Sequence, residues 1–266
     1  MPKLSIITIN LNNKSGLDKT IRSVIAQTYY EYEYIVIDGG SDDGSVEVIN
    51  QHKDKITKWI SEKDWGIYNA MNKGINVASG EYCLFLNSGD YLVSPEVITK
   101  VFSQNHNEDI LYGELIFDFG EGRKETPKLP KKLDLPYLYS DNIWHPAAFI
   151  KKVLLQSVGG YTEKYKIAGD YDFFFNTIAI KKVSCLYLPY PIAVYDTKGV
   201  SSLSENMPDV LSERRLVHQT YLEENEIVFL NNLKKYKNPG LSRWLIDKPI
   251  ATRIVDLLQR IYRKIV

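Results

Sequence analysis

Three aspartates, Asp38, Asp90 and Asp170, lie far apart in the sequence. Each has neighbouring residues that suit binding of a charged ligand or catalysis on it. Asp38 follows the apolar run 34–37, and Asp90 closes a polar turn that follows the apolar run 82–86. In an open α/β sheet, ligands bind beyond the carboxyl ends of the strands, where two of these carboxylates are expected. The arrangement predicts a nucleotide-dependent enzyme.

Strand-like and helix-like segments alternate four times in the first 105 residues, and they must position the first two aspartates. Short apolar runs typical of buried strands occur at 4–9, 34–37, 58–61 and 82–86, and apolar residues recur at helical spacing over 15–27, 46–52, 66–77 and 95–102. Such alternation implies parallel strands joined by right-handed crossovers. We therefore predict a doubly wound, Rossmann-like α/β fold, with a mainly parallel sheet flanked by helices.

The pattern changes after residue 105. A hairpin is predicted over 110–126, a surface loop over 127–136, further strands and a helix over 145–152, 170–180 and 184–195, and helix over 205–232. We expect one domain over 1–204, with a nucleotide-binding half over 1–105 and an acceptor half over 106–204. Residues 205–266 are expected to form a helical C-terminal extension.

Composition excludes several classes of protein. The 266 residues have a formal net charge of zero, which gives no support for binding nucleic acid. Cys83 and Cys185 lie in apolar runs without metal-ligand spacing, so we expect reduced, buried thiols and a cytoplasmic setting. The N-terminus lacks the pattern of a signal peptide, and no apolar stretch reaches the 18 residues of a membrane span.

Six short motifs occur in one order along the chain: SIITINLN (5–12), IDGGSDDGS (37–45), AMNKGI (70–75), ASGEY (78–82), NSGD (87–90) and GDYD (169–172). Together they resemble the inverting family 2 glycosyltransferases of GT-A fold, and the resemblance extends to about residue 202. DWGIYNAMNKG (64–74) and the NSGD form are similar to the branch that builds bacterial surface polysaccharides. The resemblance implies transfer of a sugar from a nucleotide diphosphate sugar to a glycan or lipid-linked acceptor.

The resemblance also implies a nucleotide-binding role for Asp38, whose carboxylate can accept a hydrogen bond from the N–H of a uracil. The family usually has two adjacent aspartates here, whereas this chain has Asp38-Gly39. The alternative is a structural turn, because Asp and Gly after a strand favour one.

The motif at residues 87–90 occupies the place of the family's metal-binding aspartate cluster. Only Asp90 matches a metal-coordinating position, because Asn87 and Gly89 replace two of the three carboxylates. The resemblance implies Mn²⁺ or Mg²⁺, hard ions that bind carboxylates and diphosphate oxygens. The alternative is a polar turn without a metal.

Asp170 matches the family's catalytic base, although Gly169 precedes it instead of the common glutamate. An inverting transfer needs a carboxylate that removes the proton of the attacking hydroxyl. Two alternatives remain at this stage: Asp170 is a helix N-cap, or Asp172 is the base.

The remaining contacts implied by the resemblance concern the donor. His145 is expected to touch the diphosphate, the metal or the acceptor, with a structural histidine as the alternative. Residues 199–202 resemble the family's closing loop over the donor. The donor-binding set is expected to include Thr8, Ile9, Asn10, Asp38, Asn72, Lys73, Asn87 and Ser88.

The C-terminal segment 241–266 is basic and amphipathic. It contains six Lys/Arg and two Asp, a net charge of +4 in a chain whose total is zero. This pattern favours a helix lying in an anionic membrane interface, at the inner face of the cytoplasmic membrane. A helix packed on the domain or on a dimer partner explains the pattern equally well.

Two other functions compete with sugar transfer. A Rossmann dehydrogenase requires Gly-x-Gly-x-x-Gly after the first strand, but residues 10–13 read Asn-Leu-Asn-Asn. A catalytically weak module of the same fold that only binds nucleotide or sugar would explain the reduced aspartate cluster. The presence of Asp170 argues for the enzyme.

Overall fold

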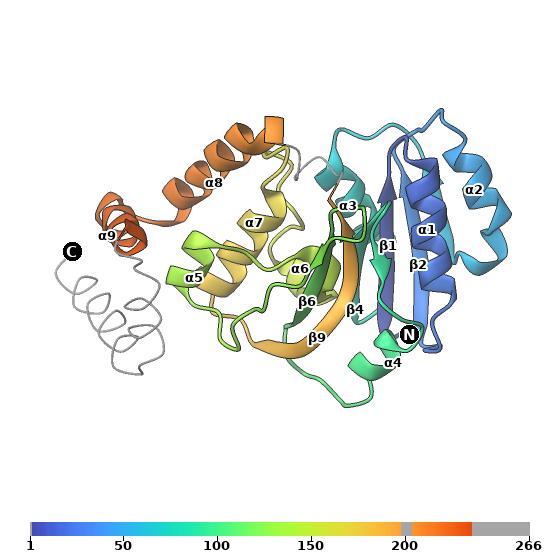
Figure 1. Cartoon of the computed structure of the whole chain (residues 1–266), viewed down its shortest axis with the longest axis horizontal. Helices are drawn as coiled ribbons and strands as arrows, with labels where there is room; N and C mark the ends of the chain where they lie inside the picture. Colours follow the sequence, from blue (N-terminus) through green and yellow to red (C-terminus); the bar gives the residue numbers. More distant parts are fainter. Residues whose placement is uncertain (1, 198–203, 236–266) are drawn as a thin grey trace. The chain divides into compact units, whose positions relative to one another are not determined.

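The computed structural model describes residues 2–197 and 204–235 (Figure 1). The chain divides into two compact units, Met1–Tyr221 and Leu222–Val266. In the described part of the second unit, α9 spans Glu224–Lys235. The elements below belong to the first unit. The boundary expected at residue 204 stays a prediction.

The first half of the sheet has the predicted order of elements. Its strands are β1 (Leu4–Asn10), β2 (Tyr32–Asp38), β3 (Lys58–Ser61) and β4 (Tyr82–Asn87), and its helices are α1 (Lys14–Ile25), α2 (Ser45–Gln51), α3 (Ile67–Val77) and α4 (Val97–Val101). All four strands are parallel and lie in the order β3-β2-β1-β4. The alternation read from the sequence is therefore confirmed.

Helices cover both faces of these strands. Ile6 of β1 and Leu84 of β4 lie in one buried cluster with Leu17 of α1. On the other face α3 approaches β1 closely, because a Cβ atom at Gly74 would lie 2.5 Å from the Cγ2 atom of Ile7. Burial on both faces explains why the central strands β1 and β4 are almost continuously apolar.

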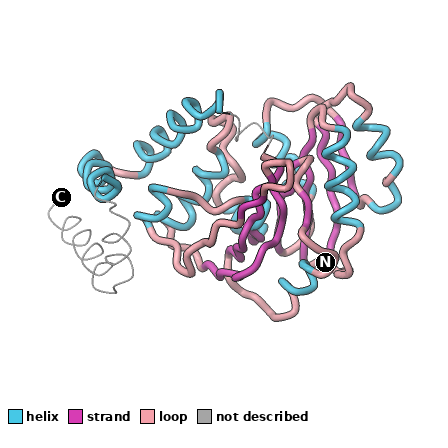
Figure 2. Tube along the Cα trace, in the orientation of Figure 1, coloured by secondary structure: helices cyan, strands magenta, loops and turns pink. Residues whose placement is uncertain are grey.

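The second half makes the sheet mixed. Figure 2 shows the strands of this sheet in magenta, with helices in cyan around them. It adds β5 (Tyr91–Leu92), β6 (Ile110–Asp118), β7 (Lys124–Glu125), β8 (Ala148–Lys151) and β9 (Cys185–Asp196), with α5 (Leu135–Ser140), α6 (Lys152–Ser157), α7 (Gly169–Phe174) and α8 (Met207–Tyr221). β8 is antiparallel to β4 and β6, whereas β9 is parallel to β6 and antiparallel to β5. The predicted hairpin is the β6–β7 pair.

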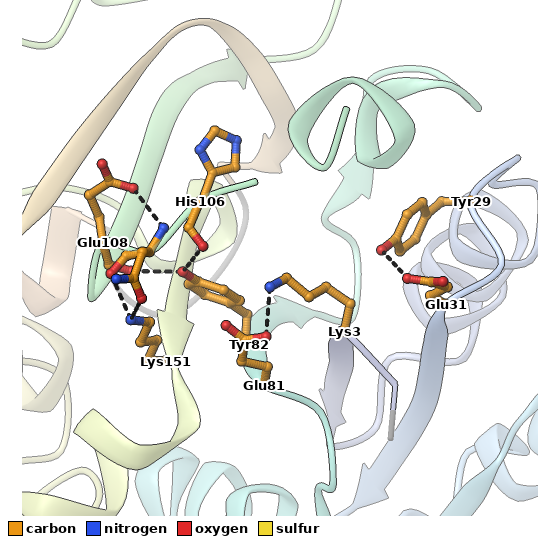
Figure 3. Close-up of polar contacts among 9 residues, drawn as sticks. Lys3, Tyr29, Glu31, Glu81, Tyr82, His106, Glu108 and Lys151 are labelled. Carbon is orange, nitrogen blue, oxygen red and sulfur yellow. Dashed lines mark hydrogen bonds and ion pairs between the residues drawn. The ribbon is translucent and has the colours of Figure 1, made fainter. Parts of the chain in front are cut away.

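Polar contacts close the amino-terminal end of the central strands (Figure 3). Lys3 forms a 2.6 Å ion pair with Glu81, and the Tyr82 hydroxyl donates to the carbonyl oxygen of Glu108 at 2.8 Å. At the opposite end, Asn10 is in register with Asp38, and Ile9 with Asn87. The polar residues named from the sequence therefore meet at the carboxyl end.

Candidate functional site

A cavity of about 760 Å³ lies beyond the carboxyl ends of β1 and β4. Its walls come from the end of β1, the start of α1, the loop before α3, the turn after β4 and the end of β9. The residues that line it are Ile9, Asn10, Leu11, Asn13, Ser15, Gly16, Lys19, Asp64, Gly66, Ile67, Ala70, Asn87, Ser88, Gly89, Asp90, Tyr195 and Asp196.

Of the predicted donor and metal residues, Ile9, Asn10, Asn87, Ser88 and Asp90 lie on this wall. The other predicted residues lie elsewhere. Thr8 is fully buried, and its hydroxyl pairs with that of Tyr34 at 3.0 Å. Asn72 and Lys73 of α3 are not among the residues that line the cavity. Their binding of the donor stays a prediction.

Asn72 fastens α3 to the loop before α7. Its Nδ2 atom donates to the carbonyl oxygen of Tyr161 at 2.8 Å, and its Oδ1 atom accepts the N–H of Tyr161 at 2.9 Å. Lys73 pairs with Glu62 at 2.8 Å and donates to the carbonyl oxygen of Lys63. Both side chains therefore have partners within the protein.

Side chains of α1 and of its N-cap residue hold the turn after β4 in place. The Thr20 hydroxyl donates to the carbonyl oxygen of Asp90 at 2.6 Å and accepts the N–H of Gly89 at 3.0 Å. Asn13 Nδ2 donates to the carbonyl oxygen of Ser88 at 2.9 Å. These contacts hold the NSGD turn in one conformation, with Asp90 on the cavity wall.

Asp90 is a buried carboxylate, with 2% of its surface exposed. Its Oδ1 atom accepts the N–H of Asp196 at 3.0 Å. Burial raises the pKa of Asp90 to about 7, and the nearby charge of Asp196 acts in the same direction. A cation beside these carboxylates would favour their ionised forms.

Two residues that line the cavity, Asn10 and Asn87, also carry amide oxygens. The Oδ1 atoms of Asn10 and Asn87 are buried and have no hydrogen-bond partner. Carboxylate and amide oxygens are ligands that hard divalent ions prefer, so the residues present fit Mn²⁺ or Mg²⁺. Residues 2–197 and 204–235 contain no group of three or more His, Cys, Asp or Glu able to hold an ion by themselves. A site here would also need ligands from a substrate.

Asp38 organises the turn that follows β2. Its fully buried carboxylate accepts five hydrogen bonds, donated by Asn10 Nδ2, Ser41 Oγ, Ser61 Oγ and the N–H groups of Gly40 and Ser41. Burial favours the neutral acid, but these bonds outweigh it and hold the pKa of Asp38 below its ordinary value. The turn role is therefore present in the structure, and contact between Asp38 and a nucleotide stays a prediction.

Asp170 is the second residue of α7, which begins at Gly169, and the N-cap is Ala168. Its Oδ2 atom lies 3.2 Å from His145 Nδ1, and its Oδ1 atom lies 3.2 Å from the Tyr68 hydroxyl, whose one proton is shared with the carbonyl oxygen of Ile167. Burial acts to raise the pKa of Asp170, but the His145 contact and the other hydrogen bonds lower it overall. Asp170 therefore favours the ionised form that a base requires.

Gly169 makes the contact between Tyr68 and Asp170 possible. A Cβ atom at Gly169 would lie 2.7 Å from the Tyr68 ring.

Asp172, the alternative base, points to another part of the unit: its carboxylate accepts the Tyr221 hydroxyl at 3.4 Å, and burial raises its pKa. Of the two candidate bases, Asp170 is therefore the one whose carboxylate contacts His145.

Sequence reasoning did not name Asp64 as a site residue, although it lies in the DWGIYNAMNKG motif. It lines the cavity, and its Oδ1 atom accepts the N–H of Gly66 at 3.0 Å. A Cβ atom at Gly39 would lie 2.5 Å from Asp64 Oδ2. The glycine that replaces the second aspartate of the family pattern thus leaves room for this carboxylate.

Glu213 of α8 is a second residue that the sequence did not reveal. Its carboxylate accepts the backbone N–H groups of Lys166, Ile167 and Ala168 at 2.8, 2.9 and 2.8 Å. These residues directly precede α7, so Glu213 fixes the segment that carries Asp170. No motif marks it, because it lies on a helix beyond the motif region.

Two further predictions concern the closing loop at 199–202 and the amphipathic segment 241–266, and both lie outside the described residues. Within 2–197 and 204–235, no helix combines the length and apolar character needed to cross a bilayer.

Comparisons with known proteins show which family and fold this chain resembles. The sequence profile of the family described as Glycosyl transferase family 2 matches residues 5–157. A "PGL/p-HBAD biosynthesis glycosyltransferase" of Mycobacterium bovis (strain BCG / Pasteur 1173P2) is 27% identical over 236 residues, which cover 86% of this chain and 90% of that protein.

Two solved structures share the fold. The S. aureus TarS 1–349 complex with UDP-GlcNAc has a TM-score of 0.66 and 20% identity, covering 84% of this chain and 69% of that one. The mannosyltransferase PcManGT from Pyrobaculum calidifontis, in complex with GDP-Man and Mn²⁺, has a TM-score of 0.59 and 16% identity, covering 74% and 57%. The predicted GT-A fold is confirmed.

Proposed function

The chain belongs to glycosyl transferase family 2 and is a glycosyltransferase; we propose that it transfers a sugar, with inversion, from a UDP-sugar to a hydroxyl group of a glycan or lipid-linked acceptor. The observation that carries the proposal is the cavity at the carboxyl ends of β1 and β4, with Asp90 on its wall and the Asp170–His145 pair held by Tyr68 of α3. Structural neighbours solved with UDP-GlcNAc and UDP support the choice of nucleotide.

In this proposal Asp170 is the general base. The acceptor oxygen attacks the anomeric carbon while the bond from that carbon to the diphosphate breaks. The hydroxyl proton passes to the Asp170 carboxylate, and the nucleoside diphosphate leaves. The contacts with His145 and Tyr68 support this role because they orient the carboxylate and lower its pKa.

The donor diphosphate is proposed to bind near the NSGD turn, with Asp90 as a ligand of Mn²⁺ or Mg²⁺. When bound, the ion neutralises charge that develops on the leaving diphosphate. Asn10 and Asn87 support the assignment, because their buried Oδ1 atoms have no partner in the protein. Ile9 and Ser88 complete the part of the predicted donor set that lines the cavity.

We also propose that residues 241–266 attach the chain to the inner face of the cytoplasmic membrane, and the support for this comes from the sequence. The net charge of +4 on 241–266 suits an anionic surface. A lipid-linked acceptor would explain such a segment. Co-sedimentation with anionic liposomes should be lost at high salt and after deletion of 241–266, whereas hydrolysis of the donor should persist.

A second function, binding of nucleotide or sugar without turnover, is favoured by the reduced aspartate cluster at 87–90. One experiment separates the two functions. UDP-, GDP- and dTDP-sugars are first screened by thermal shift with and without Mn²⁺, and release of nucleotide from the stabilising donor is then measured. Slow hydrolysis that Asp170→Asn abolishes supports the enzyme, whereas stabilisation without any release in the wild type supports the binding module.

A further inference from the structure

The space beside Gly89, in the turn between β4 and β5, is filled by the carboxylate of Asp196 at the end of β9. Gly89 has a φ of +110°, and a Cβ atom built on it would lie 3.0 Å from Asp196 Oδ2 and 3.2 Å from Asp196 Cβ. Asp196 is the last residue of β9, remote in sequence from the NSGD turn. A side chain at position 89 and the present position of Asp196 therefore compete for one place.

Asp196 and Asp90 lie together on the cavity wall. The N–H of Asp196 donates to Asp90 Oδ1 at 3.0 Å, so the end of β9 is fixed against the turn. Two carboxylates on one part of the cavity wall supply the kind of oxygen ligand that hard divalent ions prefer. The pair therefore has the character of a cation site.

Asn87 gives an independent indication of a ligand. Its Oδ1 atom is buried without a hydrogen-bond partner, and Asn87 lines the same cavity as the two carboxylates. A buried polar atom without a partner costs free energy, so such atoms are uncommon in the absence of a ligand or water. An amide oxygen is also a suitable ligand for Mg²⁺ or Mn²⁺.

We propose that Asp196 supplies the second carboxylate of the divalent-cation site, beside Asp90 and the Oδ1 atom of Asn87, in place of the carboxylate that Gly89 cannot provide. The inference rests on the proposed function, because the remaining ligands come from the diphosphate of the donor. Two carboxylates and one amide oxygen leave positions open, so the ion binds weakly until the nucleotide is present.

The test measures Mn²⁺ binding rather than turnover. Full-length protein is titrated with Mn²⁺ in the presence of saturating UDP, and free Mn²⁺ is followed by electron paramagnetic resonance. The affinity for UDP alone is measured by calorimetry in EDTA. Asp196→Asn and Asn87→Ala should each weaken Mn²⁺ binding by at least ~10-fold, the lower end of the loss found when residues that hydrogen-bond to metal ligands are replaced. Asp196→Asn should also leave the affinity for UDP in EDTA unchanged.

Two further variants sharpen the test. Asp42→Asn removes an exposed carboxylate from the turn after β2 and should bind Mn²⁺ like the wild type. Asn87→Asp, introduced into the Asp196→Asn variant, returns a carboxylate to the cavity wall and should restore most of the lost affinity. A melting temperature in EDTA equal to that of the wild type would confirm that each variant is folded.

The outcomes separate this inference from the proposed function. If the wild type needs Mn²⁺ to bind UDP well, but Asp196→Asn binds Mn²⁺ within twofold of the wild type, the role of Asp196 is wrong and the proposed function remains. Equal UDP affinity in EDTA and in Mn²⁺ for the wild type rejects the cation site altogether. A wild type that binds neither UDP nor GDP overturns the proposed function as well.

Discussion

His145 Nδ1 lies 3.2 Å from Asp170 Oδ2, and this contact joins the 3₁₀ turn His145–Ala147 to α7. Only 13% of the His145 side chain and 18% of the Asp170 side chain are exposed. The contact therefore forms where little water competes for the carboxylate. It orients one oxygen of Asp170 while Tyr68 holds the other.

Replacing Asp170 by Asn should lower turnover by ~10²–10⁴-fold, the usual contribution of a general base. Donor affinity should not change, because the cavity that the donor is proposed to fill is lined by other residues. Steady-state kinetics with calorimetry of donor binding would check both expectations. Near-normal transfer by Asp170→Asn, together with loss of transfer in Asp172→Asn, would assign the role to Asp172.

Replacing His145 by Phe should shift the acid limb of the pH profile of kcat to higher pH. The His145 contact lowers the pKa of Asp170, so its loss raises that pKa, and a higher pH is then needed to ionise the base. Tyr68→Phe removes the hydroxyl beside the other oxygen of Asp170 and keeps the His145 contact, so its pH profile can be compared with that of His145→Phe. An acid limb that does not move in His145→Phe would contradict the pairing as the cause of the low pKa.

Glu213→Ala should lower kcat without changing donor affinity. The substitution leaves the N–H groups of residues 166–168 without their side-chain acceptor, so the segment before α7 loses a fixed position. Hydrogen exchange at these amides should accelerate. Asp209→Asn, at an exposed position of the same helix, is the matched control. Equal loss of donor affinity and kcat would indicate general unfolding rather than displacement of Asp170.

Asp38→Asn should destabilise the fold by ~1–3 kcal/mol at pH 7, because an amide cannot accept all five hydrogen bonds. The pKa of Asp38 is lowered in the folded state, so its contribution is present above the ordinary aspartate pKa and is lost as pH falls through the folded-state value. Urea unfolding at pH 7 and at about pH 3 should show the difference from the wild type narrowing in acid. If the free energies of unfolding of the variant and the wild type differ by the same amount at both pH values, this explanation is wrong.

Much of the first half of the fold could be predicted from the sequence, because each strand and helix there is a local pattern bounded by turn residues. Asn87, Ser88 and Asp90 could be placed in the site for the same reason, since they directly follow a strand. The side-chain direction of Thr8 could not be predicted. Both faces of β1 are buried, so its sequence shows no alternation that would tell one face from the other.

Residues that act through distant contacts could not be predicted either. Asp196 reaches the NSGD turn only because β9 lies beside β5 and β6 in the sheet. Glu213 reaches the start of α7 from α8. In both cases the partner groups are brought together by tertiary folding, and neither residue has a local pattern that differs from an ordinary surface carboxylate.

The close packing of Gly169 on Tyr68 means that these two positions cannot be changed independently. Placing the glutamate common in the family at position 169 would displace the phenol ring, and with it the hydroxyl that contacts Asp170. A smaller residue at position 68 would make room for that glutamate but would leave Asp170 Oδ1 without its side-chain donor. We therefore expect a larger residue at position 169 to be tolerated only when position 68 is changed together with it.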